Sequence, residues 1–158
     1  MNFRVKSIIL LLVTTILLGC QSARKTLDLK TTVELQIKAL NNINPNEQKR
    51  PSPLIIQLHY LADNVQFERE DFLSLYEKAS ERLGKDLIDK QSLKEFSPGE
   101  SRIEKMVINN NAKYIGILAE FFDYDVANPL LILPITEHRK NSYRIVIDRT
   151  DIKVIESY

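Results

Sequence analysis

Alternation of apolar and polar residues is the feature that most narrows the fold open to this chain. In residues 31–40, Val33, Leu35, Ile37 and Ala39 alternate with polar side chains. A period of two places one set on each face of a β-strand. Short apolar runs at residues 54–61, 101–109, 112–122, 130–135, 142–148 and 152–156 predict further strands. We expect the strand at 54–61 to pair with the first strand, and the run at 112–122 to lie centrally, covered on both faces.

A helical insertion interrupts these strands at about residues 67–90. Phe72, Leu75, Ala79 and Leu83 recur at steps of three and four among charged residues, which predicts an amphipathic helix. Gly84 follows where a left-handed C-terminal cap is favoured. Residues 85–93 are ambiguous, either a connector or one more helical turn. Many short strands with one helical insertion favour a mainly β fold, a β-sandwich formed by residues 31–158.

The N-terminus has the layout of an export signal. A basic stretch with Arg4 and Lys6 precedes an apolar run that ends at Gly19 and Cys20. The run is about a dozen residues long, short of the ~20 that a helix needs to cross a bilayer. Residues 17–20, Leu-Leu-Gly-Cys, are similar to the bacterial lipobox. We therefore expect a cleaved signal peptide at 1–19, lipidation of Cys20 and a tether at 20–30, the alternative being a plain signal peptide followed by an incidental cysteine.

Lipidation would give the domain a stable hold on a membrane. Several acyl chains supply tens of methylene groups, each worth about 0.8 kcal/mol when buried. Gln21 follows Cys20 where an aspartate would stand in the retention signal of inner-membrane lipoproteins. This resembles the default signal for the outer membrane, which predicts a lipid-anchored location there, with the domain facing the periplasm.

Charge and residue counts argue against several classes of protein. Residues 20–158 carry 20 basic and 21 acidic side chains, without the basic excess that drives most nucleic-acid binding. The lone cysteine, Cys20, excludes an intramolecular disulfide. His59 and His138 are too isolated for a zinc site, and we expect His59 at the surface of a strand. Asp123 and Asp125 are better explained as solvated side chains than as a calcium site, so no metal or other cofactor is expected.

Catalytic residues are not expected either. Glu68, Glu70 and Asp71 fall at the start of the predicted helix, where the helix dipole already accounts for acidic side chains. The four glycines form no nucleophile elbow, phosphate-binding loop or dinucleotide-binding motif. We expect the protein not to be an enzyme.

Residues 41–53 predict a long loop between the first two strands, because the segment contains three prolines and four asparagines. Proline stiffens a loop and so lowers the entropy cost of binding, and Ile43 would offer an exposed apolar contact. The alternative is an ordinary connector.

Four sequence patterns, in this order, carry a family resemblance: the lipobox at 17–20; residues 53–61 with Phe67 and 71–76; residues 83–88 followed by 97–100; and residues 112–119 ahead of Phe121. Together they resemble the TssJ-type (VasD/Lip) outer-membrane lipoproteins of type VI secretion systems. The resemblance implies a transthyretin-like β-sandwich with a helical insertion. It also implies one partner, the periplasmic C-terminal region of the inner-membrane TssM (IcmF-like) protein, through which the lipoprotein fastens the trans-envelope complex to the outer membrane.

The same resemblance places the contact with TssM in the first loop, here residues 41–52. The residues it implies as partner-binding are Asn42, Ile43, Asn44, Pro45, Asn46 and Glu47. An unrelated periplasm-facing lipoprotein that binds a small ligand or peptidoglycan is the alternative, and it would require a concave apolar pocket.

Overall fold

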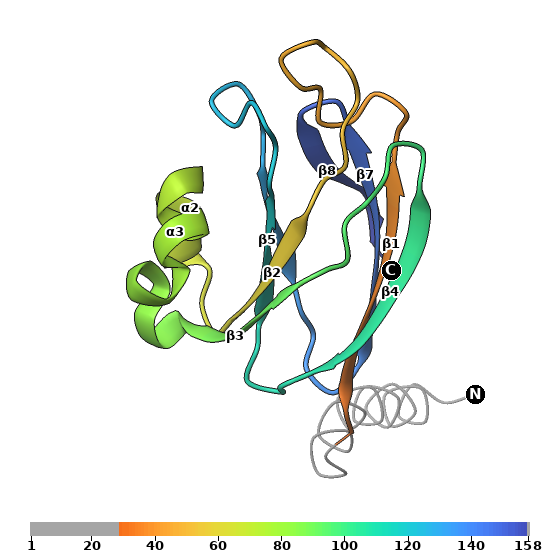
Figure 1. Ribbon diagram of the computed structural model, residues 1–158. Helices are drawn as coiled ribbons and strands as arrows, with labels where there is room; N and C mark the ends of the chain where they lie inside the picture. Colours follow the sequence, from red (N-terminus) through yellow and green to blue (C-terminus); the bar gives the residue numbers. More distant parts are fainter. Residues whose placement is uncertain (1–28, 158) are drawn as a thin grey trace, which may run out of the picture.

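The computed structural model describes residues 29–157, which form two four-stranded sheets packed face to face (Figure 1). The strand order is β4-β1-β7-β8 in one sheet and β3-β2-β5-β6 in the other. The elements in chain order are β1 (Thr31–Ala39), β2 (Ile56–Leu61), α2 (Val65–Arg69), α3 (Phe72–Leu83), η1 (Gly84–Asp86), β3 (Leu87–Ser92), β4 (Ser101–Ile108), β5 (Tyr114–Ala119), β6 (Leu130–Pro134), β7 (Lys140–Asp148) and β8 (Asp151–Ser157). The predicted β-sandwich is confirmed.

The first two strands lie in different sheets, so the expectation that they pair is wrong. β1 pairs with β4 in antiparallel and with β7 in parallel orientation, whereas β2 pairs with β3 and β5, both antiparallel. The reason is the loop at residues 41–53, which carries the chain across the sandwich. A long loop can join neighbouring strands or cross between sheets, and strand periodicity does not distinguish the two.

The sandwich core forms where the inward faces of the two sheets meet. Leu35 and Ile37 of β1 and Ile115 and Ile117 of β5 are almost completely buried there. Removing such a side chain from water contributes about 1.5–3 kcal/mol each, which makes this core the main source of stability.

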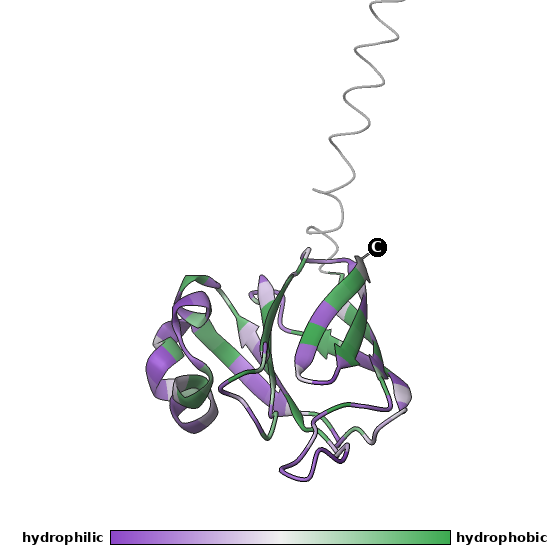
Figure 2. Cartoon of the chain, turned by 90° about the horizontal axis from the view of Figure 1, so that it is seen from above, coloured by the Kyte–Doolittle hydropathy of each residue, from purple (hydrophilic) through white to green (hydrophobic). Residues whose placement is uncertain are grey.

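Helices α2 and α3 cover the outer face of the second sheet and lie to one side of the sandwich (Figure 2). Asp71 caps α3, because its carboxylate accepts a 2.8 Å hydrogen bond from the Ser74 amide. Gly84 ends the helix with a φ of 50°, in the region that favours glycine. The helices and sheet share a second apolar cluster, formed by Leu61, Phe67, Leu75, Ala79, Leu83 and Leu118. Strand β5 is therefore covered on both faces, as its sequence predicts.

The C-terminal part of the predicted helical insertion is a strand. After the single 3-10 turn η1, residues Leu87–Ser92 form β3, which pairs with β2 at the edge of its sheet. Its last four residues are exposed, so it lacks the apolar alternation of a half-buried strand. Backbone pairing with β2, rather than side-chain pattern, explains why this segment is extended.

His59 is completely buried, against the expectation of a surface position. It points to the outer face of β2, and the helical layer covers that face. Its ring lies 5.6 Å from the ring of Phe67, and neither ring nitrogen has a hydrogen-bond partner among the described residues.

Gly116 of β5 stands opposite His59 and leaves room for Phe67. A Cβ atom at this position would lie 2.5 Å from Cε2 of Phe67, which is itself buried. We expect Gly116→Ala to reduce the free energy of unfolding by about 2 kcal/mol, because overpacking a close-packed core costs about 1–3 kcal/mol. Urea denaturation checks this.

A double variant tests whether the clash with Phe67 causes the loss of stability. Phe67→Leu should be destabilising alone, but combining it with Gly116→Ala should cost less than the sum of the two single changes, because the smaller side chain removes the clash. Strict additivity would contradict the clash as the cause.

Candidate functional site

Three chain connections meet at one end of the sandwich, at the top of Figure 1: the β1–β2 loop, the β5–β6 loop and the β7–β8 turn. They enclose an open groove of about 590 Å³. Its lining residues are Pro45, Asn46, Glu47, Lys49, Phe122, Asp123, Val126, Arg149 and Thr150. We call this the loop-end groove.

Asn44 ties the three connections together beneath the groove. Its side-chain amide donates to the Pro53 carbonyl at 2.7 Å and accepts from the Phe122 amide at 2.6 Å. Its backbone amide donates to the Arg149 carbonyl at 2.7 Å. The residue is buried and has a φ of 46°, a conformation that asparagine tolerates better than most residues. Asn44 thus fixes both walls of the groove without lining it.

Ile43 is completely buried in the sandwich core, so the expectation of an exposed apolar contact is wrong. The Ser52 amide donates to its carbonyl at 3.1 Å, which closes the base of the loop. The physical reason is that the loop folds back over the end of the sandwich, where an apolar side chain is removed from water. Ile43 therefore anchors the loop.

The tip of this loop is a compact turn held by Asn46. The Asn46 side chain accepts hydrogen bonds from the amides of Gln48 and Arg50, each at 3.0 Å. The Asn46 and Lys49 amides also donate to the carbonyls of Arg50 and Asn46, at 2.9 and 2.8 Å. These bonds fix the tip locally and leave Glu47 and Lys49 exposed.

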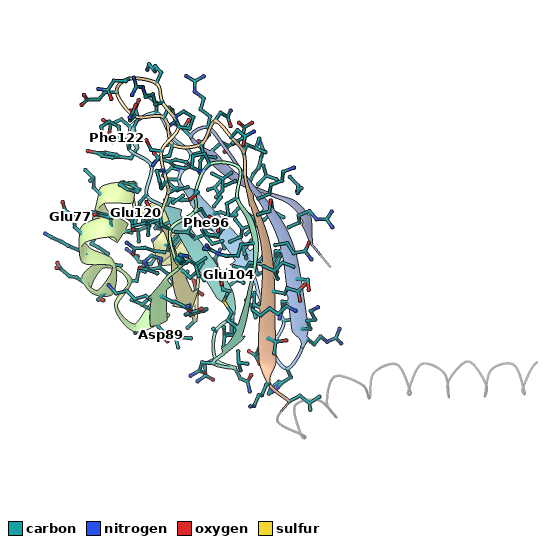
Figure 3. The ribbon with its side chains drawn as sticks, turned by 45° about the vertical axis from the view of Figure 1, so that its right-hand side comes forward. Glu77, Asp89, Phe96, Glu104, Glu120 and Phe122 are labelled. Atoms are coloured by element: carbon teal, nitrogen blue, oxygen red, sulfur yellow. The ribbon has the colours of Figure 1, made fainter. Side chains whose placement is uncertain are left out.

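The opposite wall of the groove carries two exposed apolar side chains. Phe122 is 56% exposed and Val126 is 69% exposed, and Figure 3 places Phe122 at the loop end of the molecule. Tyr124, between them, stacks on Phe72 of α3 with ring centroids 4.9 Å apart, which holds this loop against the helical layer. An exposed aromatic beside the charged side chain of Arg149 has the composition of a protein-binding hot spot.

The structure separates the predicted partner-binding residues into two groups. Pro45, Asn46 and Glu47 line the groove, and exposed Asn42 lies nearby, donating to Asp148 at 2.9 Å. Ile43 and Asn44 are buried beneath them.

Sequence reasoning missed the other wall, contributed by Phe122, Val126 and Arg149. One signal was available for Phe122. The alternation that buries Ile117, Ala119 and Phe121 directs the next side chain outward.

The carboxylates at the helices serve the fold. Glu70 is buried and pairs with Arg82 at 2.6 Å. The Ser74 amide lowers the pKa of Asp71, because it donates a hydrogen bond to the charged carboxylate. Within residues 29–157, no three His, Cys, Asp or Glu side chains gather as a metal site would require. In the same range no helix is long and apolar enough to span a bilayer.

Cys20, the signal peptide and most of the tether lie outside the described residues. The domain itself belongs to the class of β-sandwiches, with one helical layer on the outside and a groove framed by loops at one end.

The family comparison narrows this class. Residues 31–150 match the type VI secretion lipoproteins, the family of VasD, EvfM and TssJ, and the chain belongs to that family. The predicted family is therefore confirmed. No curated protein sequence matches the chain.

Solved structures share the fold of this chain. The type VI lipoprotein TssJ1 from Pseudomonas aeruginosa superimposes with a TM-score of 0.75 at 25% identity, covering 80% of this chain and 95% of that one. Lip from Serratia marcescens, a membrane-bound component of the type VI secretion system, gives 0.74 at 22% identity, covering 81% and 98%. A chain in the structure of the TssM C-terminal domain from EAEC gives 0.66 at 21% identity, covering 80% and 98%.

Proposed function

We propose that the mature protein is held by lipid on Cys20 at the inner leaflet of the outer membrane, faces the periplasm, and binds the C-terminal region of a TssM (IcmF-like) inner-membrane protein. Through this contact it fastens the type VI secretion complex to the outer membrane. Membership of the lipoprotein family supports the general role. The presence of this fold in the TssM C-terminal domain structure supports the partner.

The observation that carries the contact is the loop-end groove. Phe122 and Val126 give it an apolar wall, and Glu47 and Lys49 give the facing loop tip charges of both signs. Hydrogen bonds that the Asn44 side chain makes to both walls, and those that the Asn46 side chain accepts within the loop tip, order the groove within the free protein. Such preorganisation reduces the entropy lost on binding, so a larger part of the contact energy remains as affinity.

The position of the groove suits a mechanical role. The tether enters at Thr31, the first residue of β1, and the groove lies beyond the other end of the same strand. A pull between membrane and partner therefore runs along β1. Its ladders with β4 and β7 extend over most of the strand and tie it to the rest of the first sheet.

The test is a binding measurement by calorimetry between residues 20–158, without lipid, and the periplasmic C-terminal region of TssM from the same bacterium. We expect saturable binding, weakened at least about tenfold by Phe122→Ala, since exposed aromatic anchors commonly contribute above 1.4 kcal/mol. The double variant Glu47→Ala/Lys49→Ala should weaken it less. Neither variant should alter the melting temperature, because these side chains are largely exposed.

Ile103→Ala is the matched control, because Ile103 is 55% exposed on β4, away from the groove. Its affinity should match that of the unmodified protein. Replacing all of residues 42–47 would be a poor test, since it would also remove buried Ile43 and Asn44. Unchanged affinity in Phe122→Ala and in the loop double variant would move the contact elsewhere. No binding by the unmodified folded domain would refute the proposed partner.

A further inference from the structure

The end of the sandwich opposite the loop-end groove also has a distinct surface. It is formed by the start of β1, the β4–β5 connection and the β6–β7 connection, at the bottom of Figure 1. The His138 amide and the side chain of Asn110 both bond Thr31, so the three segments are fixed to one another. We call this surface the tether end.

Positive charge predominates at the tether end on the side of the first sheet. Its exposed basic side chains are Lys30, Lys105, Arg139 and Lys140. The acidic side chains there are Glu137 and Glu34, and Glu34 already lies 3.5 Å from Lys105 and 3.0 Å from Lys140. Asp63 and Asp86 belong to the helical layer on the other side. Lys113 lies on the side of the second sheet, where its amide donates to the Leu61 carbonyl.

Apolar side chains accompany these charges. Leu29 is 40% exposed and Val107 is 63% exposed. The Leu29 carbonyl lies 2.7 Å from the His138 ring, and Val107 pairs with Thr32 on the other side of β1. A shallow hollow of about 360 Å³ separates Val107 from Lys140. Basic side chains around a few exposed apolar ones suit the interface of an anionic bilayer, where the charges meet phosphates and the apolar groups reach the acyl boundary.

Chain length keeps this end near the membrane. Residues 20–29 can extend over at most about 30 Å between a lipid on Cys20 and Leu29. Strand β1 has nine residues and adds a further ~30 Å before the groove. The tether therefore keeps this end within about 30 Å of the headgroups, but because it is as long as β1 it does not by itself fix which end of the domain faces the membrane.

We propose that the tether end binds the surface of anionic phospholipids in the leaflet that holds the lipid anchor, and so directs the loop-end groove away from the membrane. The inference rests on the proposed anchoring through Cys20. Basic side chains near such a surface are attracted to the anionic headgroups, and the attraction falls off within a Debye length. The tether keeps the domain at an effective concentration in the millimolar range, so even a weak affinity suffices for orientation.

The chain contains no tryptophan and one cysteine, which permits a direct test. Residues 20–158 are coupled through Cys20 to a maleimide phospholipid in vesicles whose phosphatidylglycerol carries brominated acyl chains that quench tryptophan. Val107→Trp reports on the tether end and Val126→Trp on the groove, from valines of similar exposure. We expect roughly twofold stronger quenching at position 107, lost in about 1 M NaCl, where the Debye length is ~3 Å.

The charge-reversal variant Lys30→Glu/Arg139→Glu should abolish the difference between the two reporters while the melting temperature stays the same, since both side chains are exposed. Equal quenching at both positions, or a difference that survives charge reversal, would overturn the proposal. Because the lipid is attached to Cys20 chemically, this result does not depend on whether the bacterium lipidates the protein. Failure of the proposed anchoring would instead be seen by mass spectrometry, as a Cys20 without acyl chains in protein from the native bacterium.

Discussion

Acidification from about pH 7.5 to about pH 4.5 is expected to reduce the free energy of unfolding by about 2–3 kcal/mol through His59 alone. Burial lowers the pKa of this imidazole from 6.5 to about 4 in the folded protein. The unfolded chain takes up the proton below pH 6.5, whereas the folded protein resists it until about pH 4. The contribution is therefore complete above pH 6.5 and is lost as the pH falls towards 4.

The surroundings of His59 explain the direction of this pKa shift. The ring is enclosed between β2 and the helical layer, beside Phe67, and neither nitrogen has a hydrogen-bond partner among the described residues. The charge of Lys90 on the neighbouring strand opposes a second positive charge. The backbone of Gly116 favours the proton but offsets the loss of hydration only in part.

Urea denaturation at several pH values measures this effect, with His59→Leu as the comparison. The carboxyl groups of Glu34, Asp71 and Glu100 also have lowered pKa values, so the stability of any variant declines in acid. They contribute equally to both proteins. The difference in slope between pH 6.5 and about 4.5 therefore isolates His59, and parallel curves over this range would contradict a buried neutral imidazole.

His59 also marks the limit of what the sequence could predict about the fold. Alternation places its side chain on the outer face of β2, away from the sandwich core, and in a sheet with no covering layer that face is exposed to solvent. Only the packing of α2 and α3 against β2 and β5 buries it. The strand β3 escaped prediction for a related reason, because an edge strand held by backbone pairing needs no apolar pattern.

The candidate site was predictable in part. Clustered proline and asparagine identify the loop at residues 41–53, and Pro45, Asn46 and Glu47 do line the groove. Its other wall comes from Phe122 and Arg149, which are brought there by the pairing of distant strands. Loop sequence also could not distinguish the exposed residues from Ile43 and Asn44, since their burial depends on how the loop folds onto the sandwich.

Asn44→Ala should reduce the free energy of unfolding by about 3 kcal/mol, and should weaken TssM binding about tenfold although Asn44 does not line the groove. The substitution leaves the Phe122 amide and the Pro53 carbonyl without their partner. It also places alanine at a φ of 46°, which costs about 1–2 kcal/mol. Both walls of the groove then lose the bond that fixes their spacing.

Two further variants separate the effect of the lost hydrogen bonds from that of the backbone strain. Glycine adopts a positive φ without strain but makes neither side-chain hydrogen bond. Asn44→Gly should therefore reduce the free energy of unfolding by about 1 kcal/mol less than Asn44→Ala does. Asn44→Asp keeps an acceptor for the Phe122 amide and loses the donor to Pro53, so its groove should retain more affinity than that of either other variant. Urea denaturation and calorimetry with the TssM region measure the two quantities separately. Equal stability of the glycine and alanine variants would remove backbone strain from the explanation, and full affinity in all three would show that the groove does not depend on Asn44.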